Sequence, residues 1–298
     1  MKTNSFHNYN GVVLYLDLLG FSALTLGYLE LNKSDFNPWL GDGGYKEEQY
    51  NNSTLALAIL QETRDLLDRI ATSLSVNFMM VSDCIFVWNE DPSKMLSFTS
   101  KFMTSAVKNG IFLRGGIAYG EIVEGNVVNK NGRFLLGKAV TQAVSLERKS
   151  KGCRILFNPD LHRIICNQGT FTSVINDILV EITNPITYEK YDEFKWYLFP
   201  DLHESKNTID KKYKISSTIE RLSLSIHIAC NPRFSWNEKS EEGKIHLNAS
   251  VSFLSENKLL NVNHDWVQNN SQQKKSYEIL KKCEAEMRAD LNAYINQP

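Results

Sequence analysis

The sequence lacks an excess of charge of either sign. Its 298 residues carry 33 lysines and arginines against 34 aspartates and glutamates, a formal net charge of −1 at pH 7. A chain this close to neutral has no overall attraction to nucleic acid or to an anionic membrane, although charge can still gather in a local cleft. We therefore expect neither nucleic acid nor a membrane among its partners.

Long apolar runs and paired cysteines are missing as well. No stretch approaches the ~20 apolar residues that cross a bilayer, and the opening MKTNSFHNYN has no signal-peptide core. The five cysteines form no CxxC pair, which argues against a disulfide framework and against structural zinc. These absences predict a soluble, cytoplasmic protein whose cysteines are buried free thiols.

Several motifs of well-known enzyme classes are absent too. The chain has no Walker A sequence, no HExxH pair and no nucleophile elbow, and no helix follows Gly115, Gly116 and Gly120 at the spacing of a dinucleotide fingerprint. Its composition, 42% hydrophobic and 22% charged, is that of a folded globular protein. The length suits one large domain or two small ones.

Strand and helix patterns alternate along the first 200 residues, which indicates an α+β or α/β sandwich. Apolar runs predict strands at 11–16, 75–81, 84–88, 112–128, 154–157, 178–183 and 195–199, and helical periodicity predicts helices at 54–73, 92–109 and 137–150. The polar, Gly-rich stretch 33–53 predicts a loop or lid. Residues 201–298 read as a helical C-terminal extension, with helices over 206–229 and 271–295, that packs on the core or forms a dimer contact.

Two carboxylates stand where strands end. Asp17 closes a buried strand, and Asp83 lies at the tip of the hairpin formed by 75–81 and 84–88. If these strands are neighbours, the carboxylates meet at one edge and need a shared proton or a divalent cation. The turn after Asp17 offers the N–H groups of Leu19, Gly20, Phe21 and Ser22 to an anion. Together these features describe a nucleoside triphosphate site; the alternative is that each Asp serves only as a cap or turn residue.

Four segments in order, VVLYLDLLGFSAL (12–24), MMVSDCIFVW (79–88), LRGGIAYGEIV (113–123) and LLGKAVTQAVSLE (135–147), resemble the landmarks of class III nucleotidyl cyclases. The resemblance covers about residues 9–200 and implies a catalytic domain with a ferredoxin-like βαββαβ core. It also implies a head-to-tail homodimer with composite sites. Asp17 and Asp83, with the Leu18 carbonyl, would hold two Mg²⁺ or Mn²⁺ ions. One ion would acidify the ribose 3′-OH and the other would hold the phosphates.

The sequence departs from that family at informative positions. Met79 and Phe134 occupy the places of the Lys and Asp with which adenylate cyclases select adenine, which makes ATP doubtful. Thr141 and Ser145 replace the Asn and Arg of the family's helix. Arg148, at i+7 from Thr141 and on the same helix face, would then supply the missing charge, with Lys138 and Arg114 as alternatives. The competing interpretation of Arg148 and Lys138 is a solvated helix face.

Retained aspartates with lost purine-selecting residues resemble the pyrimidine cyclases of Pycsar antiphage systems. That subgroup implies conversion of UTP or CTP to cyclic UMP or cyclic CMP, which activates a separate effector. Tyr45 and Tyr50 are the candidates for contacting the base, against the alternative of an ordinary surface loop, and Phe21 is either a base-stacking residue or a core anchor. Two other hypotheses stay open: a degenerate cyclase domain that senses nucleotides, and a structural dimerisation domain.

Overall fold

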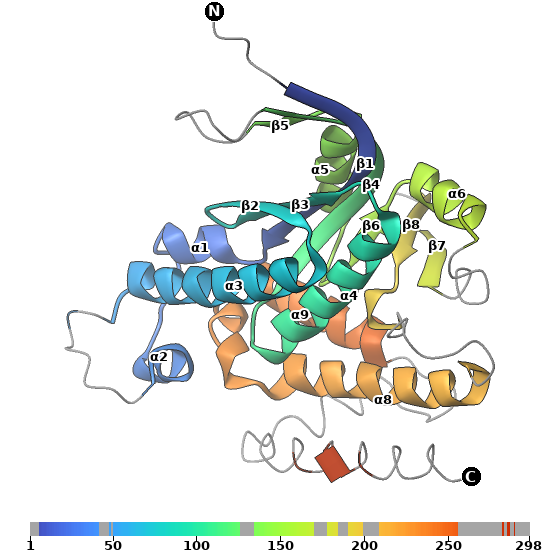
Figure 1. Ribbon diagram of the computed structural model, residues 1–298. Coiled ribbons are helices and arrows are strands. Elements are labelled where there is room, and N and C mark those ends of the chain that lie inside the picture. Colours follow the sequence, from blue (N-terminus) through green and yellow to red (C-terminus); the bar gives the residue numbers. More distant parts are fainter. Residues whose placement is uncertain are drawn as a thin grey trace, which may run out of the picture. The chain divides into compact units, whose positions relative to one another are not determined.

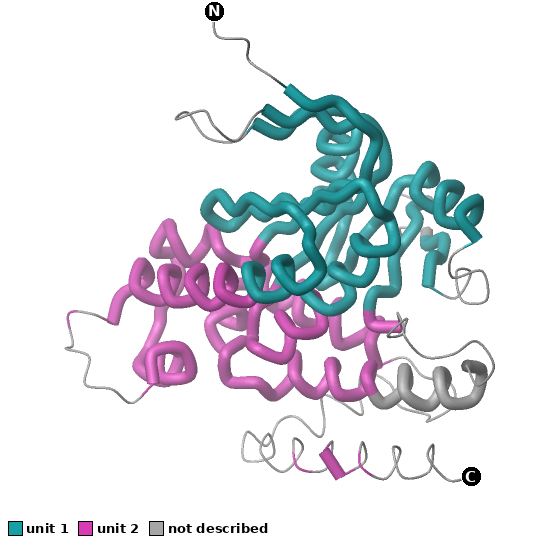
Figure 2. The backbone as a smooth tube through the Cα atoms, viewed as in Figure 1, with its two compact units in different colours: residues 1–17, 67–102, 113–196 teal, residues 18–66, 103–112, 197–298 magenta. Residues whose placement is uncertain are grey.

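The computed structural model describes residues 6–41, 48, 50–125, 134–169, 178–183, 190–198 and 209–255, and four single positions near the C-terminus (282, 285, 286 and 289). The chain forms two compact units (Figure 2). Unit 1 holds residues 1–17, 67–102 and 113–196, and unit 2 holds residues 18–66, 103–112 and 197–298. Each unit is therefore assembled from segments far apart in sequence. The boundary expected at residue 200 stays a prediction.

A mixed sheet forms the centre of unit 1 (Figure 1). Its strands are β1 (Phe6–Leu18), β2 (Asn77–Val81), β3 (Cys84–Asn89), β4 (Leu113–Gly125), β5 (Leu135–Leu136), β6 (Ile155–Phe157), β7 (Leu179–Thr183) and β8 (Lys190–Phe194). The order is β2-β3-β1-β4-β6-β8-β7, with β5 paired to β4. The first four strands, with helices α3 and α4 between them, run βαββαβ and give the ferredoxin-like order. The α+β fold class is confirmed.

The helices agree with the sequence patterns where these are strongly periodic. They are α1 (Phe21–Thr25), α2 (Lys33–Leu40), α3 (Asn52–Leu74), α4 (Pro92–Lys108), α5 (Lys138–Lys149), α6 (Pro159–Asn167), α8 (Ile209–Cys230) and α9 (Glu241–Ser255). Helices α3, α4, α5 and α8 match predictions to within a few residues. The sequence patterns did not identify α6 and α9. The helix expected over 271–295 lies outside the described residues except at four positions, all helical.

Two predicted elements are wrong. Helix α2 occupies the start of the expected loop at 33–53, because Asn32 and Asp35 form a reciprocal capping box that nucleates it. Residues 195–199 are not a strand. Strand β8 ends at Phe194, and Trp196–Leu198 is a single 3₁₀ turn. This turn buries Trp196, whose indole N–H donates to the Cys153 carbonyl at 2.9 Å.

The cysteines and the apolar length of the helices bear on the expected free thiols and on the absence of a membrane-spanning segment. Among the described residues Cys84, Cys153, Cys166 and Cys230 are free thiols. Cys153 and Cys230 are buried, but Cys166 is exposed, so the expectation of uniformly buried thiols is wrong there. No helix in the described part of the chain is both long and apolar enough to span a bilayer.

Helix α5 packs closely on the sheet in unit 1. Ala139 and Ala143 of α5 join a buried cluster with Val13 and Trp88. Gly116 of β4 permits this approach, since a Cβ there would lie 2.2 Å from the Ala143 carbonyl oxygen. The packing fixes which face of α5 is buried and leaves the opposite face exposed.

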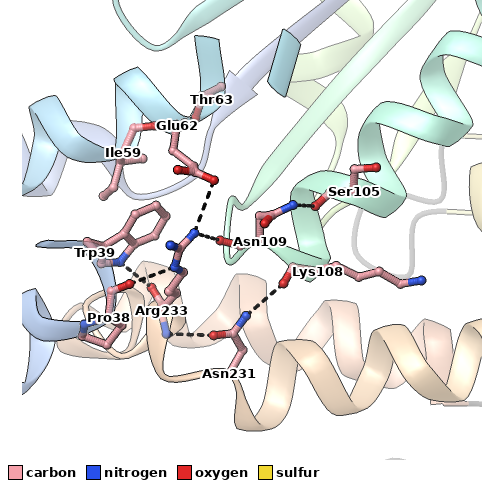
Figure 3. A network of polar contacts seen from close by, with 10 residues as sticks. All are labelled: Pro38, Trp39, Ile59, Glu62, Thr63, Ser105, Lys108, Asn109, Asn231 and Arg233. Atoms are coloured by element: carbon pink, nitrogen blue, oxygen red, sulfur yellow. Dashed lines mark hydrogen bonds and ion pairs between the residues drawn. The ribbon is translucent and has the colours of Figure 1, made fainter. Parts of the chain in front are cut away.

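Arg233, which follows helix α8, is integral to the packing of unit 2. Arg233 donates hydrogen bonds to the carbonyls of Pro38 and Asn109, both at 2.9 Å, and stacks on the Trp39 ring at 4.7 Å (Figure 3). Trp39 in return donates its indole N–H to the Arg233 carbonyl at 3.1 Å. Gly110 must be glycine beside Arg233, because its φ is +78° and a Cβ would lie 2.2 Å from the arginine Cβ. Three distant segments are thus joined at one side chain.

Candidate functional site

The structure brings the strand ends that carry the two predicted aspartates together. β1 pairs with β3 in antiparallel register, and Asp17 lies opposite Cys84, the residue after Asp83. Asp83 completes a two-residue turn between β2 and β3, in which Ser82 has a φ of +55°. Both carboxylates are half-buried. The expectation that the two strands are neighbours in one sheet is confirmed.

A third carboxylate, which the sequence patterns did not reveal, completes this cluster. Arg114 of β4 forms an ion pair with Glu147 of α5 (Nε to Oε1, 2.5 Å) and a longer one with Asp17 (Nη2 to Oδ2, 3.5 Å). Glu147 is 4% exposed. Arg114, expected as a free cation for substrate, is therefore already engaged by two carboxylates.

The electrostatics of the cluster act on Asp17. Burial, followed by the negative charge of Glu147, raises the pKa of Asp17 from 3.8 to about 6. Arg114 opposes that rise and Asp83 adds to it. Asp17 and Glu147 share one guanidinium, and Asp83 adds a third negative charge near Asp17, so the cluster carries uncompensated negative charge.

These residues fit a hard divalent cation. Magnesium is commonly held by one or two carboxylates, with substrate phosphates and water completing its shell. Asp17 and Asp83 supply two carboxylates, and a cation there would relieve their mutual repulsion. Among the described residues, no group of three or more His, Cys, Asp or Glu side chains is arranged to enclose an ion by itself. The site therefore suits an ion whose coordination the substrate completes.

The turn after Asp17 is more constrained than the sequence suggests. The Leu19 N–H donates to the Phe112 carbonyl at 2.8 Å. The expectation that this N–H is offered to an anion is therefore wrong. Gly20, with a φ of +83°, precedes the short helix α1, whose first N–H groups lack acceptors within the helix. Phe21 is 3% exposed. Its side chain is a core anchor and is not available to stack on a base.

The cations predicted on α5 differ in their surroundings. Arg148 shares an exposed face with Thr141 and Ser145, as the helical spacing predicts. Within the described part of the chain Arg148 has no ion-pair partner, whereas Lys138 lies 3.7 Å from Asp160. Of the three cations considered for phosphate binding, Arg148 is thus the one that has no ion-pair partner among the residues that the structure describes.

The residues considered for base selection lie in different environments. Met79 packs against the buried cluster beneath α5, and Phe134 is 53% exposed. In unit 2, the Tyr50 ring meets Phe36 edge-on at 5.3 Å, and the Lys33 ammonium lies 5.6 Å from its centre. Tyr45 lies outside the described residues. A contact between Tyr50 and a base stays a prediction.

Comparison with known proteins gives fold-level likeness only. No family model and no curated protein matches the chain. Among solved structures it is similar to a guanylyl cyclase domain of the RhoGC fusion protein from the fungus Blastocladiella emersonii (15% identity, 64% of this chain and 97% of that one, TM-score 0.45). It is also similar to a bacterial light-regulated adenylyl cyclase (13%, 74% and 59%, 0.45) and to the adenylyl cyclase CyaB from P. aeruginosa (18%, 69% and 100%, 0.37). Values this low assign no activity, which depends on the site itself.

Proposed function

We propose that this protein is a metal-dependent nucleotidyl cyclase that converts a pyrimidine nucleoside triphosphate, UTP or CTP, to the 3′,5′-cyclic nucleotide and pyrophosphate. One observation carries the proposal: Asp17 and Asp83 stand at adjoining ends of two paired strands, and Asp17 lies beside the ion pair of Arg114 with the buried Glu147. The cluster has excess negative charge and the hard oxygen ligands that Mg²⁺ or Mn²⁺ prefers.

The proposed reaction is an in-line displacement. The 3′-OH gives its proton to water, and the ribose 3′-oxygen forms a bond to the α-phosphorus. The bond between the α-phosphorus and the oxygen that bridges it to the β-phosphate breaks, and pyrophosphate leaves with that electron pair. Two bound ions would acidify the 3′-OH and neutralise the departing pyrophosphate. The protein's own residues hold the geometry. Arg114 restrains the Asp17 carboxylate from one side, and Arg148 from the partner's α5 would place positive charge on the α-phosphate.

The proposed preference for pyrimidines rests on Met79 and Phe134, which the sequence resemblance places where adenylate cyclases read the purine. A purine-reading site needs polar groups aimed at the purine edge, and a missing partner costs ~1–3 kcal/mol, roughly ten- to a hundredfold in selectivity. Met79 and Phe134 offer no such groups. We expect a higher kcat/KM for UTP or CTP than for ATP and GTP, with Mn²⁺ present and all four compared below saturation. An ATP value equal to or above both pyrimidine values would overturn the preference and leave the cyclase proposal standing.

Tyr50 provides a second test of the base site. If its ring contacts the base, Tyr50→Ala lowers kcat/KM for the preferred pyrimidine and narrows the gap to ATP. Tyr28→Ala is the matched control, because Tyr28 is 75% exposed in the same unit. Equal, unchanged selectivity in both variants would assign Tyr50 to packing against α2 alone.

The wider role we propose is synthesis of a second messenger in antiphage defence. A homodimer with composite sites would make the cyclic nucleotide, and a separate effector would respond to it. The support is the sequence resemblance to Pycsar cyclases together with the retained aspartates.

One observation favours a second candidate function. Thr141 and Ser145 cannot supply the amide and the positive charge of the Asn and Arg found on the helix of class III cyclases. Their absence suits a degenerate domain that binds nucleotides without turnover. Incubation of the protein with each triphosphate and Mn²⁺ separates the two. Cyclic product supports the enzyme, whereas saturable binding without product supports the sensor.

A further inference from the structure

The turn that follows Asp17 is held by a residue from the far end of the chain. The side-chain amide of Asn237 donates to the Leu19 carbonyl at 3.0 Å, across 218 residues of sequence. The Leu19 N–H is bonded to Phe112. Both backbone polar groups of Leu19 are therefore fixed, which sets the path of the chain as it leaves β1.

Trp236 and Asn237 also enclose Gly20. A Cβ on Gly20 would lie 3.2 Å from the Asn237 amide nitrogen and 3.3 Å from the six-membered ring of Trp236. Both enclosing side chains are 1% exposed. Gly20 itself adopts a φ of +83°, a conformation that other residues rarely adopt, so the turn is restrained by its own geometry and by this contact.

Asn237 is tightly packed, and burying its side chain disfavours folding. Gly243 of α9 packs against its backbone so closely that a Cβ there would lie 1.9 Å from the Asn237 carbonyl oxygen. The side-chain Oδ1 of Asn237 is buried and has no hydrogen-bond partner among the described residues. Burying an unpaired amide oxygen disfavours folding, so an apolar residue of similar size would suit packing better. Within the described part of the chain, the side chain makes one hydrogen bond, to the Leu19 carbonyl, and we take holding this turn to be its role.

We propose that Asn237 and Trp236 are positioning residues for divalent-cation binding: they fix the turn at Leu19 and Gly20 and thereby the backbone that follows Asp17. The inference rests on the proposed function, because it takes Asp17 and the adjoining Leu18 carbonyl as ligands. Groups that orient ligands without touching the ion commonly change metal affinity when they are removed.

The test compares two buried asparagines of the same segment in the full-length protein. Asn231 is 7% exposed, donates to the Lys108 carbonyl at 3.3 Å and accepts from the Arg233 backbone N–H at 3.0 Å (Figure 3). Among the described residues it makes no hydrogen bond to the turn at Leu19 and Gly20. Mn²⁺ alone is titrated without nucleotide and followed by the electron paramagnetic resonance signal of free Mn²⁺. Turnover is measured separately as a function of Mn²⁺. We expect Asn237→Ala to raise the Mn²⁺ concentration at half-saturation by about tenfold or more in both measurements. Asn231→Ala should match the wild type in both, and kcat at saturating Mn²⁺ should change little in either variant.

Other results separate the two proposals. If wild-type protein shows no Mn²⁺ binding that Asp17→Ala removes, the proposed function fails. If wild type binds Mn²⁺ through Asp17 but Asn237→Ala binds it equally well, only the positioning role fails. An equal loss in both asparagine variants would reduce the effect to general destabilisation and also overturn the role. If Asn237→Ala does not fold, Trp236→Phe carries the test. It shortens the ring against Gly20, and it must weaken Mn²⁺ binding for the proposal to stand.

Discussion

Asp17 is a carboxylate whose environment opposes its ionisation. Its pKa is about 6 in the folded protein against an ordinary 3.8, because burial and Glu147 disfavour the charged form. Folding therefore favours the protonated carboxyl. The protonated Asp17 carboxyl contributes its full stabilisation below pH 4. As the pH rises through about 6 this stabilisation is lost, and the free energy of unfolding falls by roughly 3 kcal/mol.

Asp17→Asn tests this sign. Without metal, the variant should be as stable as the wild type at pH 3.5 and more stable at pH 7, as measured by urea unfolding in a chelator. It should also lose turnover, because a neutral amide is a poor ligand for Mg²⁺. Asp160→Asn, at a partly exposed carboxylate beside Arg163, provides the control. An equal difference between wild type and Asp17→Asn at both pH values would contradict the prediction.

The sequence identified Asp17 and Asp83 because a charge at the end of an apolar strand is visible in a short window. Glu147 was missed, although a signal existed. It follows Ala139 and Ala143 at intervals of four, and so lies on the buried face of an otherwise amphipathic helix. A charge on a buried face requires a partner, and Arg114 is that partner. Which strand would supply it depends on sheet order, which local patterns do not contain.

Strand β4 and helix α5 are joined by that ion pair, which gives a prediction at the scale of elements. Arg114→Met leaves Glu147 buried without a counter-charge and should destabilise the protein by about 3–5 kcal/mol. The double variant Arg114→Met, Glu147→Leu removes both charges and should recover most of the loss. Urea unfolding of Arg114→Met, Glu147→Leu and the double variant gives the coupling energy between the two side chains. Strictly additive losses would show that the pair is not coupled.

Elements set by local signals were predicted well, and those set by weak or distant ones were not. The periodic helices α3 and α5 and the β2–β3 hairpin follow from residues within each segment. Helix α2 was hidden by its polar, proline-containing sequence, although Asn32 and Asp35 carry a capping signal. The 3₁₀ turn at 196–198 resembles a strand in composition, and only the burial of Trp196 against residues far away in sequence selects the turn.

At the scale of the whole molecule, Arg148, which is exposed and has no ion-pair partner among the described residues, gives a prediction about assembly. If sites are shared between two chains, Asp17→Ala and Arg148→Ala chains should each be inactive. When mixed, they should partly restore activity, since one of the two sites in a heterodimer is then intact. Activity is measured after exchange of subunits has been verified by labelled chains. Inactivity of the verified heterodimers would show that Arg148 does not act across an interface.

The Arg233 network makes a second prediction at this scale (Figure 3). Arg233→Ala removes donors from two backbone carbonyls and the cation from the face of Trp39, and should destabilise the protein by about 2–4 kcal/mol. Arg163→Ala, which removes an exposed pair with Asp160, should cost less than about 0.5 kcal/mol. Denaturant midpoints of the two variants are compared. Equal midpoints would mean that the C-terminal segment does not stabilise unit 2.

The bond between Leu19 and Asn237 also has a consequence in time. A ribosome that adds about 5–20 residues per second needs roughly 10 to 40 s to make the chain between them. Through that interval the turn after Asp17 lacks the support of Asn237, and until residue 112 has been made it lacks that of Phe112 as well. A contact of such long sequence separation is also slow to form, because the entropy cost of closing the loop comes before the hydrogen bond can stabilise it. A nascent or prematurely ended chain would therefore carry both aspartates without this support, and under the proposed positioning role it would need a higher Mn²⁺ concentration than the full chain to fill its site.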